Sequence, residues 1–319
     1  MTFRKSDSRG VAYGALLLTA GLWASSVVTA RGLLDALPPV TLAFLRWTVV
    51  LLLLAAFAWP QRKAMIATLR AHPRDYAALA ALGFAPQTCL VYYGLARSSA
   101  TLLGLLNSAI PVMIVVVLAL WRGRRPSTLE MIGLALSLSG VAYILVRGDP
   151  FALLQLRISP WDLLLLAAMV VWAFYTIKLT ERPANLSMPA FVFLCALLGM
   201  LFALPLLIIE IVVYGVSSLP LEQALGIFYL GTFPTLLATL LFAFGVMRVG
   251  AVQAGMFTHL VPVFAAFLAV VFLDEHLQPF HALGFVLIAG GAILCCLRRE
   301  PMLSSRPARV APERPLSAR

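Results

Sequence analysis

Ionisable residues are scarce within the apolar stretches of this chain, so the few that occur there are the first candidates for chemistry. Arg46 is the only strong charge deep inside such a stretch, and His259 is the only histidine well inside one. A cation held away from water attracts an anionic group such as a carboxylate, and an imidazole can bind a substrate or carry a proton. Each also has an ordinary explanation, because Arg46 lies near enough to the end of its stretch to snorkel and His259 can hydrogen-bond between helices.

Two prolines interrupt apolar stretches next to polar residues. Pro111 follows Asn107, and Pro262 follows Thr258 and His259. Proline removes a helical hydrogen bond and frees a carbonyl group about one turn earlier. A broken helix with polar side chains at membrane depth is typical of a substrate site, although a packing kink with a satisfied backbone gives the same pattern.

The sequence has no set of residues that is typical of a catalytic or metal centre. It contains no HExxH, no CxxC and no glycine-rich phosphate loop. Four cysteines lie inside apolar stretches without metal-ligand spacing, as small core residues do: Cys89, Cys195, Cys295 and Cys296. We therefore expect neither an enzyme nor a bound metal or other cofactor.

The composition is that of an integral membrane protein. Hydrophobic residues make up 62% of the chain and charged residues only 12%, whereas soluble domains carry about 25% charged residues. About 20 apolar residues cross the hydrocarbon core as a helix. Ten stretches of about that length predict spanning helices: 11–33, 40–59, 76–96, 100–121, 129–146, 161–179, 189–214, 222–247, 251–273 and 279–297. A cleaved signal peptide is an alternative for the first stretch, but no soluble domain follows it.

The basic residues are distributed as the positive-inside rule requires if both termini are cytoplasmic. With the N-terminus inside, nineteen of the 24 Lys and Arg residues fall in cytoplasmic segments and four in external ones. This distribution explains the net charge of +11, and no aromatic-interleaved basic surface suggests nucleic-acid binding. The Pro-, Ser- and Arg-rich residues 298–319 predict a disordered basic cytoplasmic tail.

The chain repeats itself at a spacing of 151 residues. Gly94 aligns with Gly245, Pro111 with Pro262, and the glycines at 133 and 140 with those at 284 and 291, without a gap. Each copy holds five predicted helices, so the second must enter the membrane from the opposite face. This inversion explains why the fourth helix of the first copy ends in arginines (122, 124, 125), whereas that of the second ends in Asp274 and Glu275.

Residues 260–275 and 283–291 resemble the second EamA unit of the drug/metabolite transporter superfamily. The stretches are LVPVF, which leads to FLDE, and then LGFVLIAGG. The resemblance covers nearly the whole chain and implies an all-helical membrane fold of ten helices in two inverted repeats, 1–147 and 148–297. The first unit departs from the pattern at Arg124, where many members carry an acid, and we attribute this difference to the cytoplasmic position of the loop.

The resemblance also implies which residues face a central cavity. Trp23, Trp172 and Tyr175 belong to the first helix of each unit, and Thr88 belongs to the third. Pro86 and Pro234 interrupt the third and eighth helices next to polar residues. We predict a substrate site from Trp23, Arg46, Thr88, Asn107, Trp172, Tyr175, Thr258 and His259, with helix breaks at Pro86, Pro111, Pro234 and Pro262.

The predicted function is that of a secondary transporter of the inner membrane. It would export small amino-acid-like or amphipathic metabolites by alternating access, as a monomer or homodimer in the lipid bilayer. Proton exchange through a membrane glutamate of the first helix is disfavoured, because that helix has none. The alternatives are a membrane-embedded enzyme, which would need a convergent catalytic set, and a receptor that binds a ligand without moving it.

Overall fold

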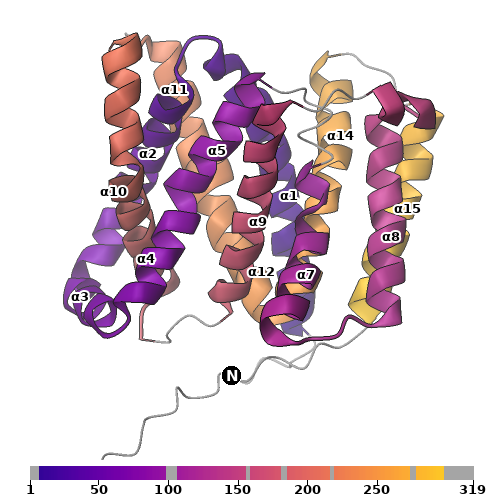
Figure 1. Ribbon diagram of the computed structural model, residues 1–319, viewed down its shortest axis with the longest axis horizontal. Helices are drawn as coiled ribbons and strands as arrows, with labels where there is room; N and C mark the ends of the chain where they lie inside the picture. The colour runs from indigo at the N-terminus through magenta and orange to yellow at the C-terminus, as the bar shows by residue number, and fades with distance from the viewer. Residues whose placement is uncertain are drawn as a thin grey trace, which may run out of the picture.

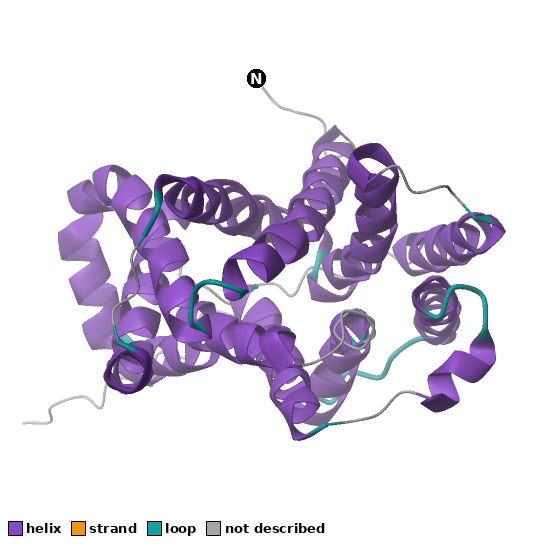
Figure 2. Cartoon of the chain, turned by 90° about the horizontal axis from the view of Figure 1, so that it is seen from above, coloured by secondary structure: helices purple, strands orange, loops and turns teal. Residues whose placement is uncertain are grey.

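A computed structural model of the protein describes residues 7–97, 106–155, 159–180, 185–215, 219–273 and 278–297. Every regular element in these ranges is helical, as Figures 1 and 2 show. The α-helices are α1 (Asp7–Leu34), α2 (Pro39–Ala58), α3 (Arg62–Ala71), α4 (Pro73–Leu82), α5 (Phe84–Arg97), α7 (Ile110–Arg122), α8 (Thr128–Leu145), α9 (Pro160–Leu179), α10 (Met188–Tyr214), α11 (Leu221–Leu230), α12 (Ala238–Val249), α13 (Ala251–Met256), α14 (Val261–Leu273) and α15 (Pro279–Leu297). Three short segments are 3₁₀-helices, η1 (Trp59–Gln61), η2 (Pro150–Gln155) and η4 (Phe257–Leu260), and η3 (Gly231–Leu237) is a π-helix.

The helices agree with the predicted membrane spans. Nine helical stretches of the described chain are long and apolar enough to cross a membrane, and a shorter apolar helix covers Leu106–Arg122. The predicted span 76–96 contains a break at Gly83, where α4 ends and α5 begins. The predicted span 251–273 consists of α13, η4 and α14 in succession. Asp274, Glu275 and the tail 298–319, for which we predicted loop charges and disorder, lie outside the described residues.

The outer surface of the bundle is apolar, as a lipid environment requires. Leu120 and Val212 are 84% and 79% exposed, and many other large hydrophobic side chains on α8, α10 and α15 are also exposed. Burial of apolar surface cannot hold such helices together in lipid, so close packing and hydrogen bonds must do so.

A glycine seam joins the last helix of each half. It consists of Gly133 and Gly140 on α8 and of Gly284 and Gly291 on α15, two antiparallel helices that lie side by side in Figure 1. A Cβ atom on any of the four would come within 3.0 Å of the carbonyl oxygen of its glycine partner, Gly291 for Gly133 and Gly284 for Gly140. The two pairs exchange places under the 151-residue repeat, so the seam has the two-fold relation of inverted copies.

A second reciprocal pair of contacts connects the first helix of each half to the third helix of the other. A Cβ atom on Gly94 of α5 would collide with Leu165 of α9, and one on Gly245 of α12 would collide with Leu16 of α1. The two glycines are equivalent in the repeat, and the two leucines are 149 residues apart. The two halves therefore pack against each other through the helix pairs α1 with α12 and α5 with α9.

Candidate functional site

A central cavity of about 160 Å³ lies between the two halves of the chain. Its lining consists of aromatic, aliphatic and uncharged polar side chains together with one arginine. The residues are Trp23, Ser26, Val27, Arg46, Trp47, Phe84, Gln87, Thr88, Val91, Tyr92, Asn107, Ile110, Trp172, Tyr175, Pro234, Thr235, Thr239, Thr258 and Val261. None of these described lining residues is Asp or Glu, so the guanidinium of Arg46 has no carboxylate counterion in the wall.

Much of the wall is built from equivalent residues of the two repeats. The pairs that line the cavity at a spacing of 151 residues are Thr88 with Thr239, Asn107 with Thr258 and Ile110 with Val261. Trp23 with Trp172 and Ser26 with Tyr175 form two further pairs, at a spacing of 149 residues. The cavity therefore lies on the pseudo-two-fold axis that relates the inverted halves.

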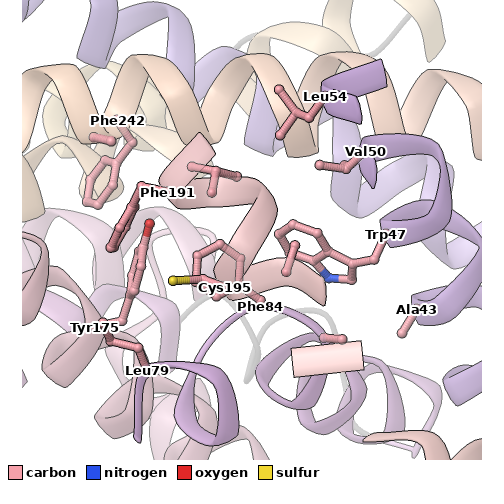
Figure 3. Close-up of a cluster of buried hydrophobic side chains, with 14 of the residues drawn as sticks. Ala43, Trp47, Val50, Leu54, Leu79, Phe84, Tyr175, Phe191, Cys195 and Phe242 are labelled. Atoms are coloured by element: carbon pink, nitrogen blue, oxygen red, sulfur yellow. The ribbon is translucent and has the colours of Figure 1, made fainter. Parts of the chain in front are cut away.

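A continuous set of aromatic rings lines part of the cavity. The indole rings of Trp23 and Trp172 meet edge to face with centroids 5.5 Å apart, and Tyr175 lies 5.1 Å from Trp172. Phe84 lies between Tyr175 and Trp47, at 5.2 and 5.3 Å, as Figure 3 shows. Such contacts fix the rings relative to one another, so they present a preformed apolar wall.

Phe84 has a left-handed backbone conformation. It is one of two non-glycine residues with positive φ in the described chain, at 56°. This left-handed conformation directly follows Gly83, at the point where α4 gives way to α5. A non-glycine residue in this region costs on the order of 1 kcal/mol, and such strain concentrates at functional sites.

Arg46 of α2 is held by two hydroxyl groups from other helices. Its Nε atom donates to Thr235 Oγ1 at 2.7 Å, and its Nη1 atom donates to the Tyr92 hydroxyl oxygen. Thr235 Oγ1 in turn donates to the carbonyl oxygen of Leu230. This carbonyl is four residues before Pro234, which has no N–H to offer it. The Leu230 carbonyl thus holds the Thr235 side chain, which in turn holds the guanidinium.

Each predicted helix break lies at an irregularity of the structure. Pro234 lies inside the π-helix η3, and Pro86 is the third residue of α5, just after the break at Gly83. Pro111 and Pro262 are the second residues of α7 and α14. A turn at Ala109 precedes Pro111, and the 3₁₀-helix η4 precedes Pro262. Asn107 lies in the helical residues just before that turn and Thr258 lies in η4, and both line the cavity.

The structure places His259 away from the cavity, in contrast to the other seven predicted substrate-binding residues, which all line it. The His259 side chain is completely buried. Its Nε2 atom lies 2.7 Å from the carbonyl oxygen of Ser108, and its Nδ1 atom lies 2.5 Å from Ser137 Oγ. Because a carbonyl only accepts, Nε2 donates and Nδ1 accepts from the serine. Both nitrogens are engaged, so we do not include His259 in the proposed substrate site.

Two hydrogen-bond donors of the aromatic wall have no partner among the described residues. They are the indole Nε1 of Trp172 and the hydroxyl of Tyr175, and both atoms are buried. An unsatisfied buried donor costs about 1–3 kcal/mol. Both residues line the cavity, but these two polar atoms are covered by protein and are not exposed to it.

Sequence reasoning missed several lining residues, among them Tyr92, Trp47 and Ser26. The repeat could have indicated Ser26, because it is equivalent to Tyr175. Tyr92 and Trp47 had no such signal, since their roles depend on contacts between helices: Tyr92 accepts from Arg46, and Trp47 Nε1 donates to Thr88 Oγ1 at 2.9 Å.

Comparisons with known proteins agree with this architecture. Residues 10–146 and 159–297 each match the EamA-like transporter family. Over 285 residues the chain is 29% identical to a Streptantibioticus cattleyicolor protein named "Probable terminal-alkyne amino-acid exporter", covering 88% of this chain and 91% of that one. It is 25% identical to the Bacillus subtilis transporter YetK, covering 91% of this chain and 88% of YetK. A solved crystal structure superposes with a TM-score of 0.71 at 21% identity, covering 92% of this chain and 97% of that one.

Proposed function

Because the chain belongs to the EamA-like transporter family, we propose that it is a secondary transporter that exports small amino-acid-like or amphipathic metabolites by alternating access. The observation that carries the proposal is the pairing of repeat-equivalent residues around one cavity. In transporters built from inverted repeats, the substrate site lies between the repeats, and rocking of one against the other opens it to either side.

The wall of the cavity supports a substrate with an apolar body and a polar head. Trp23, Trp172, Tyr175 and Phe84 offer rings on one side, whereas Thr88, Asn107 and Thr258 offer hydroxyl and amide groups. An apolar cavity of about 150 Å³ holds a benzene-sized molecule, so a small ring or branched chain suits the present volume. The relative named as an amino-acid exporter supports the same class of substrate and the outward direction.

The distribution of basic residues supports an orientation with both termini in the cytoplasm, and we propose the inner membrane as the location. The two repeats, 1–147 and 148–297, are proposed to act as the two bodies that rock. A transporter without a catalytic centre fits the cavity better than an enzyme, since no acid or metal-ligand group lies among its described lining residues.

Counterflow in proteoliposomes tests the proposal. Vesicles containing the purified protein are loaded with one member of a panel of neutral amino acids and related carboxylates, and the uptake of labelled compound from outside is followed. We expect saturable, protein-dependent counterflow for at least one compound. Its absence for the whole panel would count against transport of this class.

A pair of tryptophan variants connects the flux to the cavity. Trp172→Ala removes an indole from the wall and is expected to lower counterflow at least tenfold at equal protein content. Trp59→Ala removes the same side chain from a position that is 68% exposed and outside the cavity. It is expected to retain the flux of the unmodified protein. Equal flux in the two variants would show that transport does not depend on the Trp172 wall of this cavity.

A further inference from the structure

Arg46 brings N–H donors without partners and a positive charge to the cavity, which bears on the charge of the substrate. A guanidinium has five N–H groups, and those of Arg46 make two hydrogen bonds in the described structure, to Thr235 and Tyr92. The remaining three N–H groups have no acceptor among the described residues. They belong to a residue that lines the cavity.

Tyr92 adds another donor at the same place. Its oxygen accepts from Arg46, so its own proton is left to donate, and the guanidinium carbon lies 5.5 Å from the centre of its ring. A ligand that satisfies these groups must bring acceptors.

Arg46 makes no ion pair with a carboxylate among the described residues. No described lining residue is acidic, and the sequence has no Asp or Glu between Asp75 and Glu130, which includes the undescribed residues 98–105 that precede Asn107. An uncompensated cation in a membrane interior is costly and attracts an anion. An ammonium group beside Arg46 would instead meet a like charge.

The arginine is present in only one of the two halves. At the 149-residue spacing, Phe44-Leu45-Arg46 of α2 aligns with Phe193-Leu194-Cys195 of α10, so the equivalent of Arg46 is a buried cysteine. Gly231 of η3 lies against the backbone of Arg46, where a Cβ atom would come within 2.9 Å of its carbonyl oxygen. This close approach lets Thr235 reach Nε. A two-fold cavity thus has one charged end, in the first repeat.

We propose that the cavity selects substrates by a carboxylate held at Arg46 and Tyr92, and that an ammonium group on the substrate is dispensable. The inference rests on the proposed transport through this cavity and narrows its substrate class to organic carboxylates with a small apolar body. A bidentate pair of guanidinium and carboxylate gives both strength and orientation. The aromatic wall would then contact the apolar body.

Three probes with one phenyl ring and the same chain length test the proposal: 3-phenylpropionate, L-phenylalanine and 2-phenylethylamine. They carry a carboxylate, both charges and an ammonium, respectively. Binding is measured by equilibrium dialysis with the full chain in nanodiscs of phosphatidylcholine, so that no anionic lipid competes. We expect 3-phenylpropionate and phenylalanine to bind with similar affinity, and the amine at least tenfold more weakly. Equal or tighter binding of the amine would overturn the proposal, as would no binding of any probe.

Variants of Arg46 show whether this residue causes the preference. Arg46→Gln is expected to weaken 3-phenylpropionate binding about ten- to a hundredfold, the usual effect of losing a charged hydrogen-bond partner. Arg46→Lys keeps the charge but loses the planar pair of N–H donors. Its affinity for 3-phenylpropionate should lie between that of the unmodified protein and that of Arg46→Gln. Arg31→Gln removes an arginine that donates to the Leu95 carbonyl and does not line the cavity, and should change nothing. An unchanged ratio of acid to amine affinity in Arg46→Gln would refute the role of Arg46.

The proposal remains testable if the Arg46 variants do not fold. The ranking of the three probes on the unmodified protein needs no variant, and Tyr92→Phe removes only the hydroxyl group and is expected to weaken 3-phenylpropionate about tenfold. An unchanged affinity in Tyr92→Phe would contradict the proposed contact. Failure of this inference is also distinct from failure of the proposed function. Saturable counterflow of amines alone would support transport and refute the carboxylate site. Arg46-dependent binding of 3-phenylpropionate without flux would support the carboxylate site and refute transport.

Discussion

The glycine seam and the central cavity are two regions in which the halves of the chain meet through repeat-equivalent residues, and they differ in the size of the side chains. In the seam, Gly133 and Gly140 let α8 approach α15 until backbone meets backbone. In the cavity, Trp23 and Trp172 hold the first helices of the two halves around a space of about 160 Å³. The same two-fold relation therefore produces a closed contact or an open one, depending on whether glycine or an aromatic residue lies at the axis.

The comparison suggests different roles for the two regions. A contact without side chains resists insertion of even one methyl group, so the seam is suited to hold the halves together. The cavity contains N–H groups of Arg46 that make no hydrogen bond in the described structure and that an acceptor on a ligand would satisfy. Substitutions in the seam should affect stability, and substitutions in the cavity should affect binding and flux.

The largest effect on stability is expected from Gly291→Ala. Its Cβ atom would lie within 3.0 Å of the Gly133 carbonyl oxygen, a backbone atom that cannot turn away. Overpacking of this kind costs about 1–3 kcal/mol. The measurement is chemical unfolding in detergent, followed by tryptophan fluorescence. Gly14→Ala on α1 is the control, because a Cβ atom there meets nothing within 4 Å. Equal stability of the two variants would show that the seam is not tightly packed.

His259 is expected to behave as a structural residue. His259→Ala removes the hydrogen bonds of the imidazole with the Ser108 carbonyl and the Ser137 hydroxyl and should cost about 1–3 kcal/mol. His259→Gln retains a donor near the position of Nε2 and should recover part of this loss. Probe binding by the folded fraction of both variants should match that of the unmodified protein. A selective loss of binding, with stability intact, would return His259 to the substrate site.

A smaller effect of opposite sign is expected from Tyr175→Phe. Removing a buried hydroxyl that has no described partner should raise the stability of the empty protein by about 1 kcal/mol. Tyr92→Phe is the matched comparison, because its hydroxyl accepts from Arg46, and its loss should lower stability. A destabilised Tyr175→Phe protein would mean that this hydroxyl has a partner in the empty state.

The architecture was predictable because its signals lie along the chain. Apolar length indicates the spans, and matched glycines and prolines at a spacing of 151 residues indicate the repeat, as Gly140 and Gly291 illustrate. The positions of Trp23 and Trp172 beside a cavity followed from the resemblance to a known family. These features depend on local composition or on the order of elements, both of which a single sequence records.

The finer features of the site were not predictable, because they depend on which side chains meet across helices. His259 and Arg46 look alike in the sequence as single polar residues in apolar stretches. The structure separates them: His259 finds two partners and is buried, whereas Arg46 finds two hydroxyl groups and no acid. Glu210 is a similar case. Its carboxylate accepts from the N–H groups of Val40 and Thr41 at the start of α2, a cap supplied from α10.

The most direct test of the account is whether a group attached in the cavity blocks transport. In a background with the four native cysteines replaced by alanine, Asn107→Cys and Thr258→Cys place thiols at the equivalent positions of the two halves, and Phe267→Cys places one at a position that is 56% exposed. Counterflow is measured after reaction with a small maleimide. The account predicts loss of flux for both cavity thiols, protection of both by substrate, and normal flux for labelled Phe267→Cys. Undiminished flux through protein fully labelled at both cavity positions would contradict a substrate path between the inverted halves.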